Sequence, residues 1–180
     1  MKLKITSARL AFPQLFEAKT VNGEGKPAFS ASLLLDPADP QVKTIHQAID
    51  AVAKEKWGPK ADALLKQMRA GDKVCLHDGD LKSSYDGFAG NLYVSARSQT
   101  RPLVLDADKT PLTEADGKPY SGCYVNAVVE LWPQDNNYGK RINARLTGVQ
   151  FLKDGEAFAG GGSASEDDFE VVGDAAMDLV

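Results

Sequence analysis

Apolar and polar residues alternate along much of the chain, which predicts β-strands. Side chains of a strand alternate between the two faces of a sheet, so every second residue of a half-buried strand is apolar. Stretches with this pattern are 2–10, 28–35, 73–77, 92–100, 122–132 and 141–151. We expect Phe12-Pro13 to end or bend the first strand, and residues 132–140 to form a hairpin loop between the last two.

One part of the chain changes to the period of a helix. Asp39 followed by Pro40 is a signal for a helix start, and apolar residues then recur at helical spacing to about residue 56. A second helix is predicted over residues 60–69, and Gly71 ends it. About six strands with one insertion of two helices near residues 39–70 predict a mainly β protein. Its sheet is either a closed antiparallel barrel, of which the OB-fold is one form, or a sandwich.

The charge of the chain divides into two unequal parts. Its 180 residues include 21 basic and 25 acidic ones, a net charge of −4, which argues against a nucleic-acid partner because phosphate binding needs Lys and Arg. Residues 163–180 hold six of the acids and no base, so the rest of the chain carries 21 basic and 19 acidic residues, a net charge of +2. We predict a folded domain over residues 1–159, followed by a glycine linker and a disordered acidic tail over 160–180. The tail either binds a partner or is a solvated segment that aids solubility; its acids are Glu166, Asp167, Asp168, Glu170, Asp174 and Asp178.

The polar faces of three predicted strands carry aromatic, arginine and amide side chains, and two neighbouring loops add more aromatics. Bases stack on aromatic rings and guanidinium groups pair with phosphates, so such a surface suits single-stranded nucleic acid without a preference for sequence. The alternative is that Tyr and Arg stand there because both are good surface residues of strands. The candidate nucleic-acid-binding residues are Tyr85, Phe88, Tyr93, Arg97, Arg101, Tyr124, Asn126, Trp132, Tyr138, Lys140, Arg141, Asn143 and Arg145.

Other kinds of site have little support in the sequence. No phosphate-binding loop, nucleophile elbow or dinucleotide fingerprint occurs, so we expect neither an enzyme nor a cofactor. Cys75 and His77 share a strand face but lack a second pair of zinc ligands, and the aspartates of residues 78–86 are typical of turns, so we expect no metal. Cys75 and Cys123 are expected to be free buried thiols of a reducing cytoplasm. The sequence shows no secretory signal, and it has no run of about 18 apolar residues that could span a membrane.

Part of the sequence resembles a known bacteriophage family. The stretches 122–127 (Gly-Cys-Tyr-Val-Asn-Ala), 138–151 and 154–158, with the glycine run that follows, resemble a family long catalogued as a domain of unknown function. It is now associated with phage single-stranded-DNA-binding proteins. The resemblance extends over most of residues 1–162, and residues 122–162 are its most recognisable part. It implies an OB-fold and sequence-independent binding of single-stranded DNA, which it would protect during phage replication or recombination in the cytoplasm of the infected bacterium.

The resemblance also assigns a role to the tail. In proteins of this kind an acidic C-terminal tail docks onto replication or recombination proteins and competes with DNA for the basic groove. The last residues here, Asp178-Leu179-Val180, lack the terminal aromatic residue of many such tails. The sequence leaves the oligomeric state open, with a homodimer as one option. The alternative from a different class is a phage assembly or interaction protein, in which the barrel binds another protein and the tail aids solubility; a nuclease would need a cluster of acids that the sequence does not show.

Overall fold

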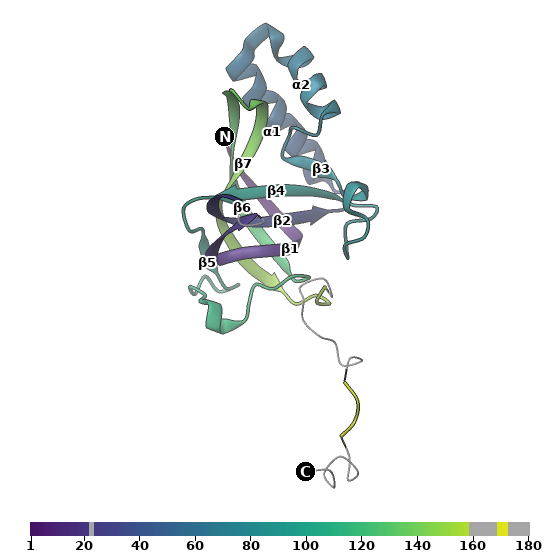
Figure 1. Cartoon of the computed structure of the whole chain (residues 1–180), viewed down its shortest axis with the longest axis vertical. Helices are drawn as coiled ribbons and strands as arrows, with labels where there is room; N and C mark the ends of the chain where they lie inside the picture. Colours follow the sequence, from purple (N-terminus) through teal and green to yellow (C-terminus); the bar gives the residue numbers. More distant parts are fainter. Residues whose placement is uncertain (22–23, 159–168, 173–180) are drawn as a thin grey trace.

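Five strands close into a barrel in the computed structural model, which describes residues 1–21, 24–158 and 169–172 (Figure 1). β2 pairs antiparallel with β1 and β4, β6 pairs antiparallel with β1 and β7, and a parallel pairing of β4 with β7 closes the ring. This is the strand arrangement of an OB-fold-like barrel, so the predicted fold class is confirmed. The barrel strands are β1 (Lys2–Val21), β2 (Glu24–Leu35), β4 (Leu92–Ser98), β6 (Tyr124–Asn136) and β7 (Gly139–Lys153).

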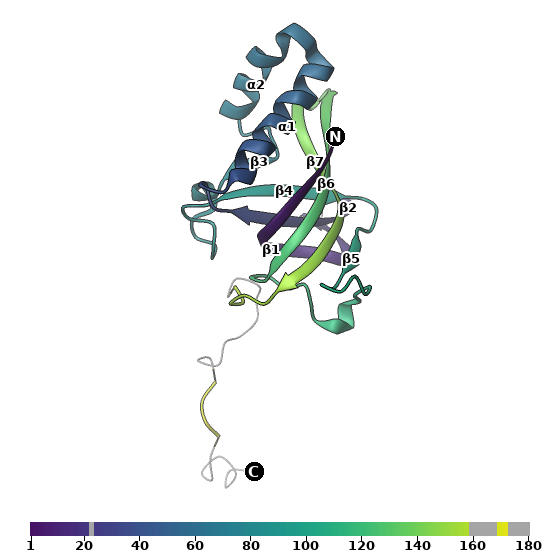
Figure 2. The same cartoon turned by 180° about the vertical axis from the view of Figure 1, so that it is seen from behind.

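The remaining elements attach to this barrel. β3 (Leu76–Asp78) pairs with β4, and β5 (Leu103–Leu105) pairs with β7. The helices α1 (Pro40–Trp57) and α2 (Ala61–Ala70) lie together at one end of the barrel, beside the far end of the β6–β7 hairpin (Figures 1 and 2). Three short 3₁₀ turns complete the described elements: η1 (Gly58–Lys60), η2 (Gly79–Lys82) and η3 (Glu114–Asp116).

The two helices confirm the prediction from spacing and capping. The side chain of Asp39 accepts a hydrogen bond from the backbone N–H of Gln41 (2.9 Å), with Pro40 in the first turn. Gly58 takes a positive φ of 55° at the other end and stops α1. Buried residues Ile45 and Ile49 face the barrel, so the helical face that the sequence marks as apolar is the one that packs.

One face of each barrel strand forms the main core, as the alternation predicts. Val125, Ala127, Val129 and Leu131 of β6 are all buried, and so are the alternate residues of β7 from Ile142 to Leu146. Cys75 and Cys123 are buried free thiols, as expected, and burial raises the pKa of the Cys75 thiol to about 12. No helix among the described residues is long and apolar enough to cross a membrane.

Several strand boundaries differ from the sequence prediction. β1 continues through Phe12, which takes a positive φ of 49° at an irregularity of the ladder, and runs on to Val21. The predicted loop 132–140 belongs to the ladder, because β6 and β7 remain paired up to Asn136 and Gly139. The apolar alternation stops at Trp132 because the outer hairpin, residues 132–143, extends past most of the core. β5 has three residues, too few for an alternation of apolar and polar positions to predict a strand. β3 occupies residues 76–78, whereas the sequence predicts a strand over 73–77. The predicted linker and most of the tail lie outside the described residues.

Candidate nucleic-acid interface

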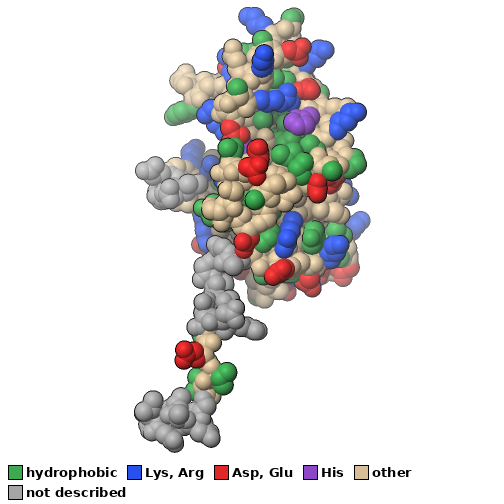
Figure 3. Space-filling model, turned by 90° about the vertical axis from the view of Figure 1, so that its right-hand side faces the viewer, with side chains coloured by type: hydrophobic (Ala, Val, Ile, Leu, Met, Phe, Trp, Pro, Cys, Tyr) green, Lys and Arg blue, Asp and Glu red, His purple; other side chains and the backbone are tan. Residues whose placement is uncertain are grey.

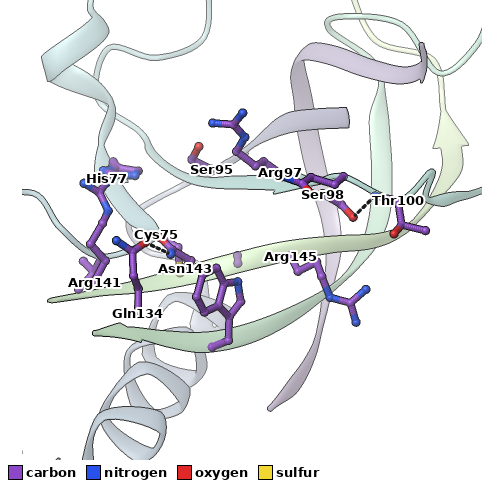
Figure 4. Close-up of a pocket in the computed structure, with 14 residues that line it drawn as sticks. Cys75, His77, Ser95, Arg97, Ser98, Thr100, Gln134, Arg141, Asn143 and Arg145 are labelled. Atoms are coloured by element: carbon purple, nitrogen blue, oxygen red, sulfur yellow. Dashed lines mark hydrogen bonds between the residues drawn. The ribbon is translucent and has the colours of Figure 1, made fainter. Parts of the chain in front are cut away.

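A groove of about 740 Å³ lies over the junction of β4 and β7 (Figure 4). The parallel register places Ala96 beside Ala144 and Arg97 beside Arg145, so small side chains face the core and both arginines face outward. One side of the groove is formed by β4 and the residues after it, and the other by β7 and the outer hairpin. The groove residues are Val74, Cys75, His77, Ser95, Arg97, Ser98, Gln99, Thr100, Trp132, Gln134, Arg141, Asn143, Ala144 and Arg145.

The lining of the groove contains three arginines and no acidic residue. Among the described residues no carboxylate forms an ion pair with Arg97, Arg141 or Arg145. Glu130 stands opposite Arg145 in the ladder but pairs with the N-terminal ammonium group (3.3 Å). On the face of the molecule that Figure 3 shows, acidic and basic side chains are intermingled. The absence of acids from the groove lining is therefore a local feature. Uncompensated guanidinium groups of this kind attract anions such as phosphates.

The groove also offers an aromatic ring and polar amides. Trp132 of β6 is 42% exposed and lines the groove, which leaves part of its ring accessible for stacking. Gln134 accepts a hydrogen bond from the side-chain amide of Asn143 (2.8 Å), as Figure 4 shows, and this bond fixes both amides across the hairpin. At the other side, the His77 ring stacks on Tyr93 with 4.9 Å between centroids and its Nδ1 lies 2.6 Å from the Asp72 carboxylate. The three arginines therefore share the groove with an exposed ring on which a base can stack.

The structure brings five of the thirteen candidate residues together in this groove: Arg97, Trp132, Arg141, Asn143 and Arg145. Two more belong to the outer hairpin outside the groove lining. Tyr138 is 90% exposed at its turn, and Lys140 forms an ion pair with Asp135 (3.5 Å).

Three further candidates lie elsewhere on the barrel. Tyr124 packs under the cationic groups of Arg9 and Lys153, at 5.8 and 4.9 Å from its ring centroid. Asn126 accepts a hydrogen bond from the backbone of Ser7 (3.0 Å) and lines a separate hollow of about 520 Å³ on the β5–β7–β6 surface. Arg101 lies over the ring of Phe16 (5.6 Å). These side chains share the outward direction of the groove residues but not their location.

The prediction that Phe88 and Tyr93 are accessible is wrong. Phe88 is fully buried and Tyr93 is 4% exposed, in a small second core with Ala11 and Leu34. The loop before β4 covers the outer surface of β2 and β4 there, so a face that the pattern marks as solvent-exposed became an interior. Tyr85 of the same loop is 46% exposed and makes an edge contact with Phe12 (5.0 Å between centroids). Of the predicted tail acids the structure describes Glu170, which is exposed; Glu166, Asp167, Asp168, Asp174 and Asp178 lie outside the described residues.

Sequence reasoning missed six polar groove residues: His77, Ser95, Ser98, Gln99, Thr100 and Gln134. The strand pattern places Ser95 and Gln99 on the face of Arg97, so this signal was available and unused. His77 and Gln134 gave no such signal, because their position depends on the bridge between Val74 and Ile142 and on the length of the hairpin.

A glycine pair explains part of the motif that carries the family resemblance. A Cβ atom at Gly122 would collide with the backbone of Glu156, and one at Gly155 would collide with the backbone of Gly122. This close approach lets the segment after β7 fold back, where Arg9 donates hydrogen bonds to the carbonyls of Gly122 (3.0 Å) and Glu156 (2.7 Å) and lies over the Phe158 ring. The motif therefore holds the end of the folded domain against the barrel.

Comparisons with known proteins relate the chain to bacteriophage proteins. A family model described as the ssDNA-binding protein of Enterobacter phage Enc34 matches residues 1–180. Protein p50 of Acyrthosiphon pisum secondary endosymbiont phage 1 is 47% identical over 173 residues, which cover 94% of this chain and 93% of that protein. The solved structure of the single-stranded DNA-binding protein from bacteriophage Enc34 in complex with ssDNA has a TM-score of 0.73 and 28% identity, covering 87% of this chain and 88% of that one. The single-stranded DNA-binding protein gp2.5 of bacteriophage T7 has a TM-score of 0.57 at 15% identity, covering 91% of this chain and 98% of that one, a likeness of fold alone.

Proposed function

The chain belongs to the family of the ssDNA-binding protein of Enterobacter phage Enc34, and on that premise we propose that it binds single-stranded DNA in the groove over the β4–β7 junction. The acid-free lining with three arginines around the exposed Trp132 is the observation that carries the proposal. The protein acts by binding and not as an enzyme.

The groove residues divide the work between phosphates and bases. Arg97 and Arg145 stand side by side on neighbouring strands and contact successive phosphates, while Arg141 extends the charge along the outer hairpin. A base stacks on Trp132, which contributes about 1–3 kcal/mol. Both contacts use groups that every nucleotide has, so binding tolerates any sequence. Paired bases in a duplex are already stacked and cannot offer a face to Trp132, so single strands bind more tightly than duplexes.

Titrating a fluorescent oligo-dT, a mixed-sequence single strand and a duplex at several salt concentrations tests the proposal. We expect similar affinities for the two single strands, a weaker one for the duplex, and a fall in affinity as salt rises. The Lys66→Gln variant controls for the loss of one positive charge elsewhere on the surface. Lys66 is an exposed base of α2 outside the groove lining, so this variant should bind the single strands as the wild type does. If none of the single strands binds, the alternative of a barrel that binds protein takes the place of this function.

We propose further that the acidic tail regulates this binding, in the cytoplasm of an infected bacterium where the protein protects DNA during replication or recombination. Six acids without a base in residues 163–180 support a segment that competes with DNA for the arginines and docks onto partner proteins. Deleting residues 163–180 is expected to tighten binding of oligo-dT at low salt. A full-length variant with the six acids changed to amides separates the effect of charge from that of length, and unchanged affinity in both proteins would refute competition.

A further inference from the structure

The tip of the outer hairpin extends beyond the residues that bond the hairpin to the rest of the barrel. The last barrel-side support is at Ile142, whose backbone N–H donates to the carbonyl of Lys73 (3.1 Å). Past this point the strands of the hairpin pair only with each other, up to Asn136 and Gly139. Gln134 and Arg141 belong to this unsupported part and line the groove. A two-stranded ribbon without a core is marginally stable by itself, so the groove wall needs a support from elsewhere.

A side chain of the helical insertion reaches this tip. The indole Nε1 of Trp57 donates a hydrogen bond to Oδ2 of Asp135 (3.0 Å). Among the described residues this is the one hydrogen bond that joins residues 134–141 to an element other than β6 and β7. The other carboxylate oxygen of Asp135 pairs with Lys140 on the opposite strand (3.5 Å). One carboxylate therefore connects the helix with both strands of the hairpin. We call the Trp57–Asp135 hydrogen bond the hairpin tie.

Both ends of the hairpin tie are held in place. Trp57 is the last residue of α1, and Gly58 ends the helix directly after it. The indole ring is partly buried against the main core, so the donor does not move independently of the barrel. The N–H of Trp57 is the main cause that lowers the pKa of Asp135, with the charges of Lys140 and Lys56 adding to it. The acceptor is therefore ionised at neutral pH, which makes the bond charge-assisted.

The hairpin tie and the groove use opposite faces of the same strand. Successive side chains of a strand point in opposite directions, so Asp135 faces α1 while Gln134 faces the groove. Gln134 is bonded in turn to Asn143, which also lines the groove. A movement of the tip away from α1 therefore displaces the amides and Arg141 from their places opposite β4.

We propose that Trp57 and Asp135 are positioning residues, which act through the hairpin to keep the groove at the width that a single DNA strand needs. This role rests on the proposed function, and neither side chain lines the groove. The two-helix insertion thereby becomes a part of the binding machinery. Without the hairpin tie, only a fraction of the molecules hold the hairpin in the position that binds DNA. The apparent affinity then equals the intrinsic affinity multiplied by that fraction.

The variant Trp57→Phe tests the proposal, because it keeps an aromatic ring against the core and removes the donor. In the absence of DNA, hydrogen exchange of the amides of residues 134–141 should become about tenfold faster. The affinity for oligo-dT should fall by about threefold or more, while its dependence on salt keeps the same slope because no phosphate contact is lost. Asp135→Ala should give the same two changes at least as strongly, because it also removes the ion pair with Lys140, and the double variant should add nothing to the effect of Asp135→Ala. Asp135→Asn keeps an oxygen acceptor for the indole N–H but loses the charge and the ion pair with Lys140, so its exchange should be slower than that of Asp135→Ala and faster than that of the wild type.

A matched control separates positioning from a general loss of stability. Ile45→Val removes one methylene from the buried face of the same helix and should lower the melting temperature without changing hairpin exchange or affinity. Wild-type exchange in Trp57→Phe would overturn the proposal, and so would faster exchange with unchanged DNA affinity. A wild-type protein that does not bind single strands would overturn the proposed function, and the exchange measurement without DNA would still decide whether the tie holds the hairpin.

Discussion

Arg97 and Arg145 provide the sharpest test of the groove, because the parallel register places them next to each other. Changing both to glutamine removes two positive charges and leaves shorter, polar side chains on the same strand face. Each arginine is exposed, so its contact with a phosphate is worth about 1 kcal/mol. Two contacts amount to about 2 kcal/mol, which weakens binding about 30-fold. For a single strand, the slope of log affinity against log salt becomes shallower by about 0.7 for each lost contact, or about 1.4 in total.

The same substitution should not destabilise the free protein. The two like charges stand on adjacent strands without a carboxylate partner among the described residues, so removing them relieves a repulsion of a few tenths of a kcal/mol. Fluorescence anisotropy at several salt concentrations measures affinity and slope, and a thermal melt measures stability. The control Lys43→Gln, Lys66→Gln makes the same change in net charge on the exposed faces of α1 and α2. If this control and the groove variant show the same affinity and slope, the groove is not the DNA site.

Four further predictions follow from particular contacts. Trp132→Ala should weaken binding of oligo-dT by about 1–3 kcal/mol, measured by anisotropy, and an unchanged affinity would exclude stacking there. Tyr124→Ala should leave affinity within about twofold, since Tyr124 packs under Arg9 and Lys153 outside the groove; a tenfold loss would extend the site to that surface. The thiols of Cys75 and Cys123 should not react with Ellman's reagent at pH 8 until the protein is unfolded, because burial raises their pKa values to about 12 and 11, and immediate labelling would contradict their burial. Because the pKa of Asp135 is lowered, its carboxylate stabilises the hairpin at every pH above the ordinary aspartate pKa, and this contribution is lost as pH falls through the lowered pKa. The NMR signal of the Trp57 indole N–H should therefore shift with a midpoint pH below 3.8. A signal that does not respond to acid would argue against the hairpin tie.

The local pattern of the sequence was sufficient for the elements and their buried faces. A period of two residues marks Val125, Val129 and Leu131 as interior on β6, and they are buried. Helical spacing and a capping signal at Asp39 located the insertion to within a residue or two. These features depend on neighbours along the chain, so one sequence is enough to show them. The charge division between residues 1–162 and 163–180 is likewise a property of the sequence alone.

The tertiary structure decided which outward side chains share a site. Arg97 and Arg145 are far apart in the sequence and meet because β4 pairs in parallel with β7, a contact that closes the barrel. The alternation marks Tyr93 as outward, but the loop with Phe88 covers that surface and buries both rings. The hydrogen bond from Trp57 to Asp135 joins elements that no local pattern relates. A period fixes the direction of a side chain relative to its own strand, whereas long-range pairing and loop packing determine what lies in that direction.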